Sequence, residues 1–500
     1  MSDDGAATQP SALASHIEGD EPATLVNNSA WGFASQILGM VAGGAVSIIA
    51  IRGLSGTAWG QYAVATALVS VFIVFSELGL STLTLRELST HPAKASATLG
   101  TALLAVAIAA TFSATLIVPI AVALGFDYAS RLMVAIAVPT LFFQPLLGII
   151  RAAFNARRRL AYVARFDAVQ TAVYTLTALA LLLLGLGAPS LVIGLVAGNV
   201  AAAILGASLV RRRLRIRPQF RGQLATTMPF MRLALPIALV GGIAILYDRV
   251  DVLLLSLLGN TLDVARYSVP YTVVRLTWSV PSVIGAAFFP LYARLREDDP
   301  TEGSRAFFLI VRVFVFLSGA TALALSFAGE ELLTFAFGAR YATSATALTI
   351  LAWGLVASFQ NYVLWYGILA ARRERAVVPV QLVGLAVNVS ANFLLIPRLG
   401  PEGAAIAFLL SDLVTTGGQF VIVHRHLYRV PVRLLVLRPL AAASVAVLIG
   451  LAASQLSGVA AAAAGVLTYV GFLLSSRYVT AEEWRPLTDP IAAMARRVRG

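Results

Sequence analysis

Long apolar runs alternate with short polar breaks along nearly the whole chain. Most runs are close to the ~20 residues that an α-helix needs to cross the hydrocarbon core of a bilayer. The breaks carry charged residues, glycine or proline, which end helices or lie at a membrane surface. The pattern predicts an all-α polytopic membrane protein with about fourteen transmembrane helices. The expected spans are 27–51, 58–80, 98–124, 130–153, 166–186, 189–210, 232–258, 264–290, 306–328, 344–370, 377–396, 403–424, 439–455 and 459–476.

Composition agrees with a protein that is solvated mainly by lipid. Of its 500 residues, 59% are hydrophobic and 12% are charged, whereas soluble domains carry about 25% charged residues. The net charge of +13 does not indicate nucleic-acid binding, because the basic residues form short clusters between apolar runs and not one soluble face. The chain has no cysteine, which excludes disulfides and thiolate metal sites. We expect no catalytic residues, no cofactor and no metal site.

The distribution of arginine gives the expected orientation. Most of the 37 Lys and Arg residues fall in every second loop and in the C-terminal tail, as the positive-inside rule predicts for cytoplasmic segments. The intervening loops hold only Arg52, Arg131, Arg266, Arg340 and Arg398. We therefore expect a multi-pass protein of a bacterial or archaeal cytoplasmic membrane, with both termini in the cytoplasm.

Weak similarity between the two halves of the chain predicts an internal repeat. "LSGTAWGQYAVA" follows the first expected span, and "LLGNTLDVARYSVP" follows the seventh. Two six-helix lobes would share one orientation, related by a pseudo-twofold axis along the membrane normal, with a cavity between them; chance similarity among Leu- and Ala-rich helices is the alternative. The expected organisation is a disordered acidic tail at 1–25, lobes at 26–222 and 223–430, two additional transmembrane helices at 431–478 and a basic tail at 479–500.

Several motifs carry a family resemblance, among them "LYDRVDVLLLSLLGN" at 246–260, "AAFFPLYARL" at 286–295 and "NVSANFLLIPRLGPEGAAIAFLLSD" at 388–412. In order and spacing they resemble the polysaccharide-export branch of the multidrug/oligosaccharidyl-lipid/polysaccharide exporter (MOP) superfamily, over about residues 25 to 475. The resemblance implies a flippase for polyprenyl-pyrophosphate-linked oligosaccharide that works by alternating access and is not an enzyme. It also implies that the two additional helices form a groove for the lipid tail, and that membrane lipid and glycosyltransferases or polymerases are partners.

Ionisable residues inside the expected spans are candidate site residues, because a charge at membrane depth is unfavourable without a partner or a function. Arg275 shares one helix face with Tyr271 and Trp278 at ~100° per residue. A guanidinium matches phosphate oxygens geometrically, and aromatic surface suits sugar rings. The alternative is that Arg275 forms a structural ion pair with Asp248 or Asp251 on the neighbouring span.

Other polar residues extend the candidate substrate site. Arg249 and Arg312 lie within spans, although Arg312 is close enough to the cytoplasmic end to extend to the interface. Arg52 ends the first span on the outer side, where it is either a substrate contact or an interfacial anchor. Asn388 and Asn392 share a face that suits either sugar hydroxyls or hydrogen bonds between helices.

Acidic residues inside the spans are candidate ion-coupling groups, and they are Glu77, Asp248, Asp251 and Asp412. No phosphate-binding loop signature is present, so coupling is expected to use H⁺ or Na⁺. Two other functions fit the same pattern less well. An ion-coupled drug or cation antiporter of the same fold would favour acids over arginines, and a membrane oligosaccharide polymerase or ligase would need a larger outer loop.

Overall fold

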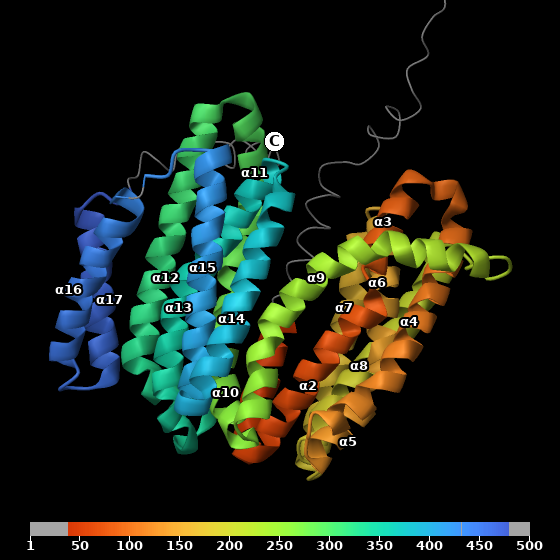
Figure 1. The fold of residues 1–500 in the computed structure, drawn as a ribbon, viewed down its shortest axis with the longest axis horizontal. Coiled ribbons are helices and arrows are strands. Elements are labelled where there is room, and N and C mark those ends of the chain that lie inside the picture. The colour runs from red at the N-terminus through yellow and green to blue at the C-terminus, as the bar shows by residue number, and fades with distance from the viewer. Residues whose placement is uncertain (1–38, 432, 480–500) are drawn as a thin grey trace, which may run out of the picture.

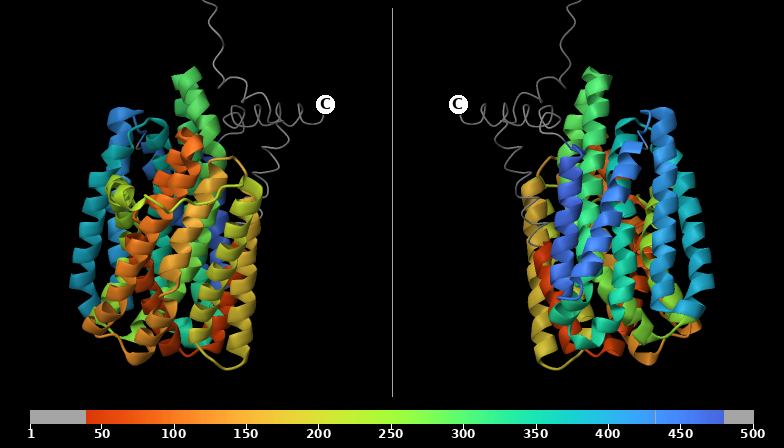
Figure 2. Two further views of the ribbon diagram at one scale, coloured as in Figure 1. Left: turned by 90° about the vertical axis from the view of Figure 1, so that its right-hand side faces the viewer. Right: turned by 90° about the vertical axis from the view of Figure 1, so that its left-hand side faces the viewer.

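The computed structural model describes residues 39–431 and 433–479, and helices dominate throughout this part of the chain (Figures 1 and 2). The prediction of an all-α polytopic membrane protein is confirmed for it. The expected acidic tail, nearly all of the basic tail and the start of the first expected span lie outside the described residues.

Two helical bundles and one further helix pair make up the structure (Figure 1). The N-terminal bundle contains the first described helix, Gly39–Gly53, followed by α2 (Gly56–Glu77), α3 (Leu80–Thr90), α4 (Ala95–Ala123), α5 (Tyr128–Ala137), α6 (Thr140–Asn155), α7 (Leu160–Leu183) and α8 (Pro189–Leu209). The C-terminal bundle contains α9 (Leu224–Leu258), α10 (Thr261–Thr277), α11 (Ser279–Asp298), α12 (Pro300–Phe337), α13 (Ala345–Ala370), α14 (Val377–Leu399) and α15 (Pro401–His426). The pair α16 (Arg438–Ala453) and α17 (Gly458–Ser475) packs against α12.

Helices occupy every expected span that lies within the described residues. Eleven of them have the length and hydropathy to cross a membrane, or twelve when the bent α9 is counted as one span. The described part of the first helix is shorter than a span, and a break at Trp278 divides one expected span into α10 and α11. The total of about fourteen spans therefore stays a prediction.

Side-chain caps explain why several helices begin where they do. The first N–H groups of a helix have no intrahelical acceptor, and a Ser, Asp or Asn oxygen satisfies them. Ser55 accepts from Ala58 at 3.1 Å, at the start of α2. Asp127 and Asn260 each accept at 3.0 Å, at the starts of α5 and α10. These short polar breaks thus separate one apolar run from the next.

Helix α9 belongs to both bundles. It bends by 50° between the segments 224–239 and 241–258, and Pro236 and the Gly241–Gly242 pair lie at this bend. Proline removes a helical hydrogen bond, and such residues are the usual cause of sharp kinks. The first half of α9 packs against α3 and α4 (Figure 1), and the second half packs against α14 and α10 and also contacts α2, where a Cβ on Gly242 would lie 3.2 Å from Val74.

The two bundles meet closely at one end of the molecule, which we call the closed end. There the start of α2 approaches the start of α10 so tightly that a Cβ on Gly60 would lie 1.9 Å from the Thr261 carbonyl oxygen. About two turns further along α10, the Trp59 indole donates to the Ser268 hydroxyl at 3.0 Å. Only glycine allows this approach at position 60. Toward the opposite end the two bundles diverge (Figure 1).

Two arginines add hydrogen bonds between the bundles at the closed end. Arg340, in the short 3-10 helix Ala339–Ser344 after α12, donates to the carbonyl oxygens of Ile51 and Arg52, each at 2.7 Å. Arg52 donates in turn to the carbonyl oxygen of Phe335, in the last turn of α12. The last carbonyls of a helix lack intrahelical partners and carry partial negative charge. Each arginine therefore satisfies the end of a helix in the other bundle.

We predict that Arg340→Ala weakens the closed end, because two carbonyl groups lose their donor across the bundle interface. The native chain has no cysteine, so spin labels on Thr57→Cys and Ala339→Cys report the separation directly by pulsed electron resonance. Arg340→Ala should populate longer distances. Arg266→Ala is the matched control, because Arg266 pairs with Asp263 of its own helix at 3.7 Å; equal distance distributions in the two variants would contradict the prediction.

Candidate functional site

A cavity of about 430 Å³ lies between the two bundles. Pockets of roughly 300–1,000 Å³ are typical of small-ligand sites. Six helices contribute to its wall. The lining residues are Gly39, Met40, Gly43, Gly44, Ser47, Trp59, Tyr62, Ala63, Tyr174, Arg249, Val252, Ser268, Tyr271, Thr272, Arg275, Leu276 and Ser279. We call this the central cavity.

Both cations of the central cavity come from the C-terminal bundle. Arg275 is exposed to it near the end of α10. Among the described residues, no carboxylate lies within ion-pair distance of its guanidinium. Arg249 on α9 lies close to Asp248, with 3.2 Å between Nε and Oδ2. The alternative pairing of Arg275 with Asp248 or Asp251 is absent from this part of the chain, so Arg275 presents its positive charge to the cavity.

Aromatic rings from the N-terminal bundle face these arginines. Trp59 and Tyr62 lie three residues apart on α2 with ring centroids 5.2 Å apart, and Tyr174 of α7 lines the same cavity. Sequence analysis missed all three as site residues, because tyrosine and tryptophan are ordinary near membrane surfaces. The one available signal was the spacing of Trp59 and Tyr62, which puts both on one helix face.

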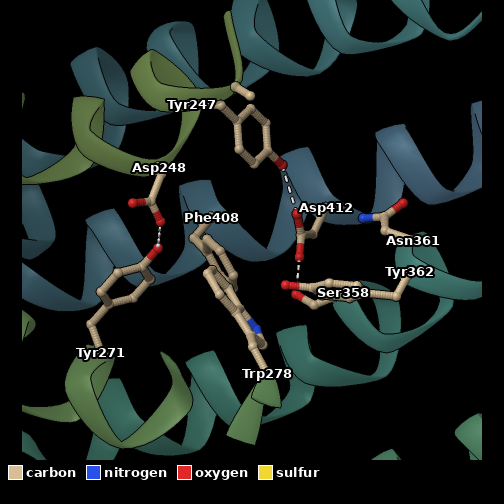
Figure 3. Close-up of a pocket in the computed structure, with 10 residues that line it drawn as sticks. Tyr247, Asp248, Tyr271, Trp278, Ser358, Asn361, Tyr362, Phe408 and Asp412 are labelled. Carbon is tan, nitrogen blue, oxygen red and sulfur yellow. Dashed lines mark hydrogen bonds between the residues drawn. The ribbon is translucent and has the colours of Figure 1, made fainter. Parts of the chain in front are cut away.

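A second cavity, of about 190 Å³, lies inside the C-terminal bundle (Figure 3). We call it the acidic pocket, because the carboxylates of Asp248 and Asp412 line it. The Tyr271 hydroxyl donates to Asp248 Oδ1 at 2.7 Å, and the Tyr247 hydroxyl donates to Asp412 Oδ1 at 2.7 Å. The remaining wall contains Ala244, Trp278, Ser358, Asn361, Tyr362 and Phe408. Ser358 also donates to Asp412, so oxygen ligands suited to a hard cation converge here.

Asp251 is buried more deeply than the other two carboxylates. It is 2% exposed and accepts from Tyr267 at 2.8 Å and from Asn392 at 2.7 Å. Asn388 is also buried and donates to Ser411 at 3.2 Å. Both asparagines thus hydrogen-bond between helices and line neither cavity. These contacts join α14 to α9 and α15.

The remaining sequence-predicted residues lie elsewhere. Trp278 lines the acidic pocket and not the central cavity; it stacks against Phe408, with ring centroids 6.5 Å apart. Arg312 is buried on α12 and donates to the Tyr478 carbonyl at 2.8 Å, beyond the end of α17. Arg52 lies at the closed end. Glu77 lies in the last turn of α2, on the side of Gly148 of α6. The structure thus brings together Arg249, Arg275 and Tyr271 in one cavity.

We predict that Tyr267→Phe destabilises the protein, because a buried carboxylate loses one of its two side-chain donors. A hydrogen bond to a charged group contributes about 1.5–3 kcal/mol, and the melting temperature in detergent should fall accordingly. Tyr469→Phe is the matched control, because this buried hydroxyl donates only to a neutral carbonyl, that of Val315, at 3.2 Å. An equal or smaller loss for Tyr267→Phe would contradict the prediction.

Comparison with solved structures identifies proteins that share this fold. Among solved structures, the lipid II flippase MurJ in an inward closed conformation matches with a TM-score of 0.71 and 13% identity, over 90% of this chain and 99% of MurJ. An inward-facing multidrug resistance MATE family transporter of the MOP superfamily matches with a TM-score of 0.62 and 13% identity, over 82% of this chain and 96% of that chain. At these identities the likeness shows a shared fold.

Sequence comparison gives the family. The capsular polysaccharide biosynthesis protein CapF of Staphylococcus aureus is 22% identical over 213 residues, which are 42% of this chain and just over half, 54%, of that relative. The model of the family described as "Polysaccharide biosynthesis protein" matches residues 25–296, more than half of the 500 residues. The chain therefore belongs to the polysaccharide biosynthesis protein family, with the fold of the MOP superfamily.

Proposed function

We propose that the protein is a flippase, which moves polyprenyl-pyrophosphate-linked oligosaccharide from the cytoplasmic to the outer leaflet by alternating access. The observation that carries this proposal is the central cavity. Its C-terminal wall offers two guanidinium groups to the anionic diphosphate, and planar guanidinium donors match phosphate oxygens. Its N-terminal wall offers Trp59, Tyr62 and Tyr174 to sugar rings. A polysaccharide biosynthesis transporter of the MOP fold supplies the biological setting.

The proposal includes a topology. About fourteen spans form two six-helix lobes related by a pseudo-twofold axis, with both termini in the cytoplasm and α16–α17 outside the symmetry. The closed end then faces outward, because Arg52 and Arg340 belong to the loops that are poor in basic residues. The diverging end faces the cytoplasm, where glycosyltransferases assemble the substrate, and a polymerase on the far side would receive it.

Ion coupling is the second part of the proposal. Asp248 and Asp412 line the acidic pocket, and the buried Asp251 lies one turn from Asp248; Glu77 in the other bundle is a separate candidate. Na⁺ or H⁺ bound among these carboxylates would link the transport cycle to an ion gradient. Moving one charge across 100 mV involves about 2.3 kcal/mol, enough to bias a two-state carrier.

The acidic pocket also favours a second candidate function, an antiporter for drugs or other organic cations. Two carboxylates and five aromatic side chains suit a cationic aromatic compound. Reconstitution distinguishes the two functions. Proteoliposomes are loaded with a fluorescent polyprenyl-diphosphate saccharide, and protein-dependent movement between leaflets supports the flippase. Uptake of an organic cation without lipid movement would replace the flippase with the antiporter.

We predict that Arg275→Gln and Arg249→Gln each slow lipid movement by roughly 10- to 100-fold, since each removes charge-assisted hydrogen bonds to phosphate of about 1.5–3 kcal/mol. Arg165→Gln is the matched control: it removes one positive charge from an exposed side chain that lies over the Tyr162 ring, outside the central cavity. Normal movement with both cavity variants would exclude the cations from substrate binding.

We predict that Gly43→Leu blocks transport by filling the central cavity. Gly43 lines the cavity, and a Cβ at this position meets no atom within 4 Å, so the side chain enters open space without disturbing the helices. Leucine also has a higher helix propensity than glycine. Gly471→Leu on α17 is the control, because its Cβ likewise meets nothing within 4 Å. Unchanged transport by a folded Gly43→Leu protein would place the substrate path elsewhere.

A further inference from the structure

The central cavity and the acidic pocket share a wall, and one carboxylate lies at that wall. Tyr271 lines both cavities. Asp248 lines the acidic pocket, and the adjacent Arg249 lines the central cavity. The two oxygens of Asp248 divide between these neighbours, with Oδ1 2.7 Å from the Tyr271 hydroxyl and Oδ2 3.2 Å from Arg249 Nε. The same carboxylate therefore faces a candidate cation site and restrains a candidate phosphate ligand.

The contact between Asp248 and Arg249 is a close ion pair without a well-formed hydrogen bond. Arg249 Nε is buried and has no hydrogen-bond partner among the described residues, although the carboxylate lies within 4 Å. The two side chains remain 24% and 21% exposed. Attraction thus holds the guanidinium near Asp248 while its Nε lacks a hydrogen-bond acceptor among the described residues. An anion in the central cavity, which Arg249 lines, can provide that acceptor.

Tyr271, by contrast, is held firmly. Its ring stacks on Tyr267 at a centroid distance of 5.6 Å and meets Trp278 and Phe408 edge-on, each at 5.9 Å. Its hydroxyl therefore keeps Asp248 in place at the wall. Of the two neighbours of the carboxylate, Arg249 is the one that can move.

We propose that Asp248 couples the two cavities: a monovalent cation bound against its carboxylate releases Arg249 to bind the diphosphate of the substrate. The inference rests on the proposed function and concerns the sign of coupling. Both ligands must disrupt the same Asp248–Arg249 pair. The ligand that binds first has already separated this ion pair, so the second ligand binds without that free-energy cost. Cation and diphosphate therefore bind with positive cooperativity. Linkage makes the effect reciprocal.

The charges around Asp248 support a cation at this place. Arg249 belongs to its own helix and Arg275 to α10. Across the acidic pocket lie Tyr362 of α13 and the carboxylate of Asp412 on α15, and Asp251 lies one turn along α9. Once Arg249 turns to the diphosphate, this group of acids loses its nearest positive charge. A cation replaces that charge on the pocket side.

The sign of the coupling separates this mechanism from simple exchange. An antiporter in which cation and substrate take turns needs the two ligands to compete for one site or one charge. Here they occupy different cavities on opposite sides of one ion pair, and each favours the other. The loaded carrier then holds a cation together with its anionic headgroup, which reduces the net charge that it carries.

The test measures binding of farnesyl diphosphate to the purified full-length protein at fixed pH. Na⁺ is varied at constant ionic strength, with N-methylglucamine as the replacement, because screening alone weakens phosphate contacts. We expect Na⁺ to raise the affinity of the native chain by roughly 5- to 150-fold, the usual range of allosteric coupling. Asp248→Asn should bind tightly without Na⁺ and lose the Na⁺ response, whereas Arg249→Gln should bind weakly at every Na⁺ concentration.

Two further variants make the result specific. Tyr271→Phe removes one donor from Asp248 and leaves more of its charge for Arg249, so affinity should fall without Na⁺ and recover at high Na⁺. Asp167→Asn is the matched control: its ion pair with Arg151, at 2.7 Å, lies in the N-terminal bundle and lines neither cavity. It should respond to Na⁺ as the native chain does.

The outcomes separate this inference from the function on which it rests. Native binding that Na⁺ leaves unchanged or weakens would overturn the coupling, as would an Asp248→Asn variant no tighter than the native chain, and the flippase proposal would stand. A probe that fails to bind the native chain at any Na⁺ concentration, and also fails to bind Asp248→Asn, would remove the proposed function itself.

Discussion

A charged side chain among apolar helices is stable only beside a compensating partner or in space that water can reach, and this constraint organises the interior of the protein. Asp251 is deeply buried and takes two donors. Arg151 pairs with Asp167, and Asp412 accepts hydrogen bonds from two hydroxyl groups, those of Tyr247 and Ser358. Arg275 has no such partner in the described structure and opens instead into the central cavity. Charged side chains that have partners within the protein thus hold the helices together, and those without such a partner remain available to a ligand.

The sequence predicted the elements of the fold well and their breaks less well. Apolar length located the helices, because each must hide its backbone from lipid. It did not reveal that Trp278 ends one helix and begins another, since the apolar pattern continues through this residue. It also gave no sign that Gly60 allows close contact with Thr261, because a contact between distant segments leaves no periodic signal.

The candidate site was predictable only in part. Arg249, Arg275 and Tyr271 were identified from charge and helix face, and they meet in one cavity. The pairing of Arg249 with Asp248 has no signal in the sequence: the two residues point about 100° apart on an ideal helix, yet their side chains reach each other beside α10. Long side chains extend well beyond the direction of the Cα–Cβ bond, so a helical wheel does not exclude a contact between adjacent residues. The aromatic wall needed the three-dimensional arrangement, because Tyr174 comes from a separate helix.

The bend in α9 has a consequence for motion. Its first half packs with the N-terminal bundle, whereas its second half packs with α10 and α14 of the C-terminal bundle and also contacts α2, while Asp248 and Arg249 lie about two turns beyond the bend. If the bundles rock against each other, α9 cannot follow both as a rigid rod, and the hinge must fall near Gly241 and Gly242, where backbone rotation meets least steric resistance. Every change of tilt between the bundles would then turn the segment that carries both ionic groups. Through this helix, the relative tilt of the two bundles would set the orientation of the Asp248–Arg249 pair toward both cavities.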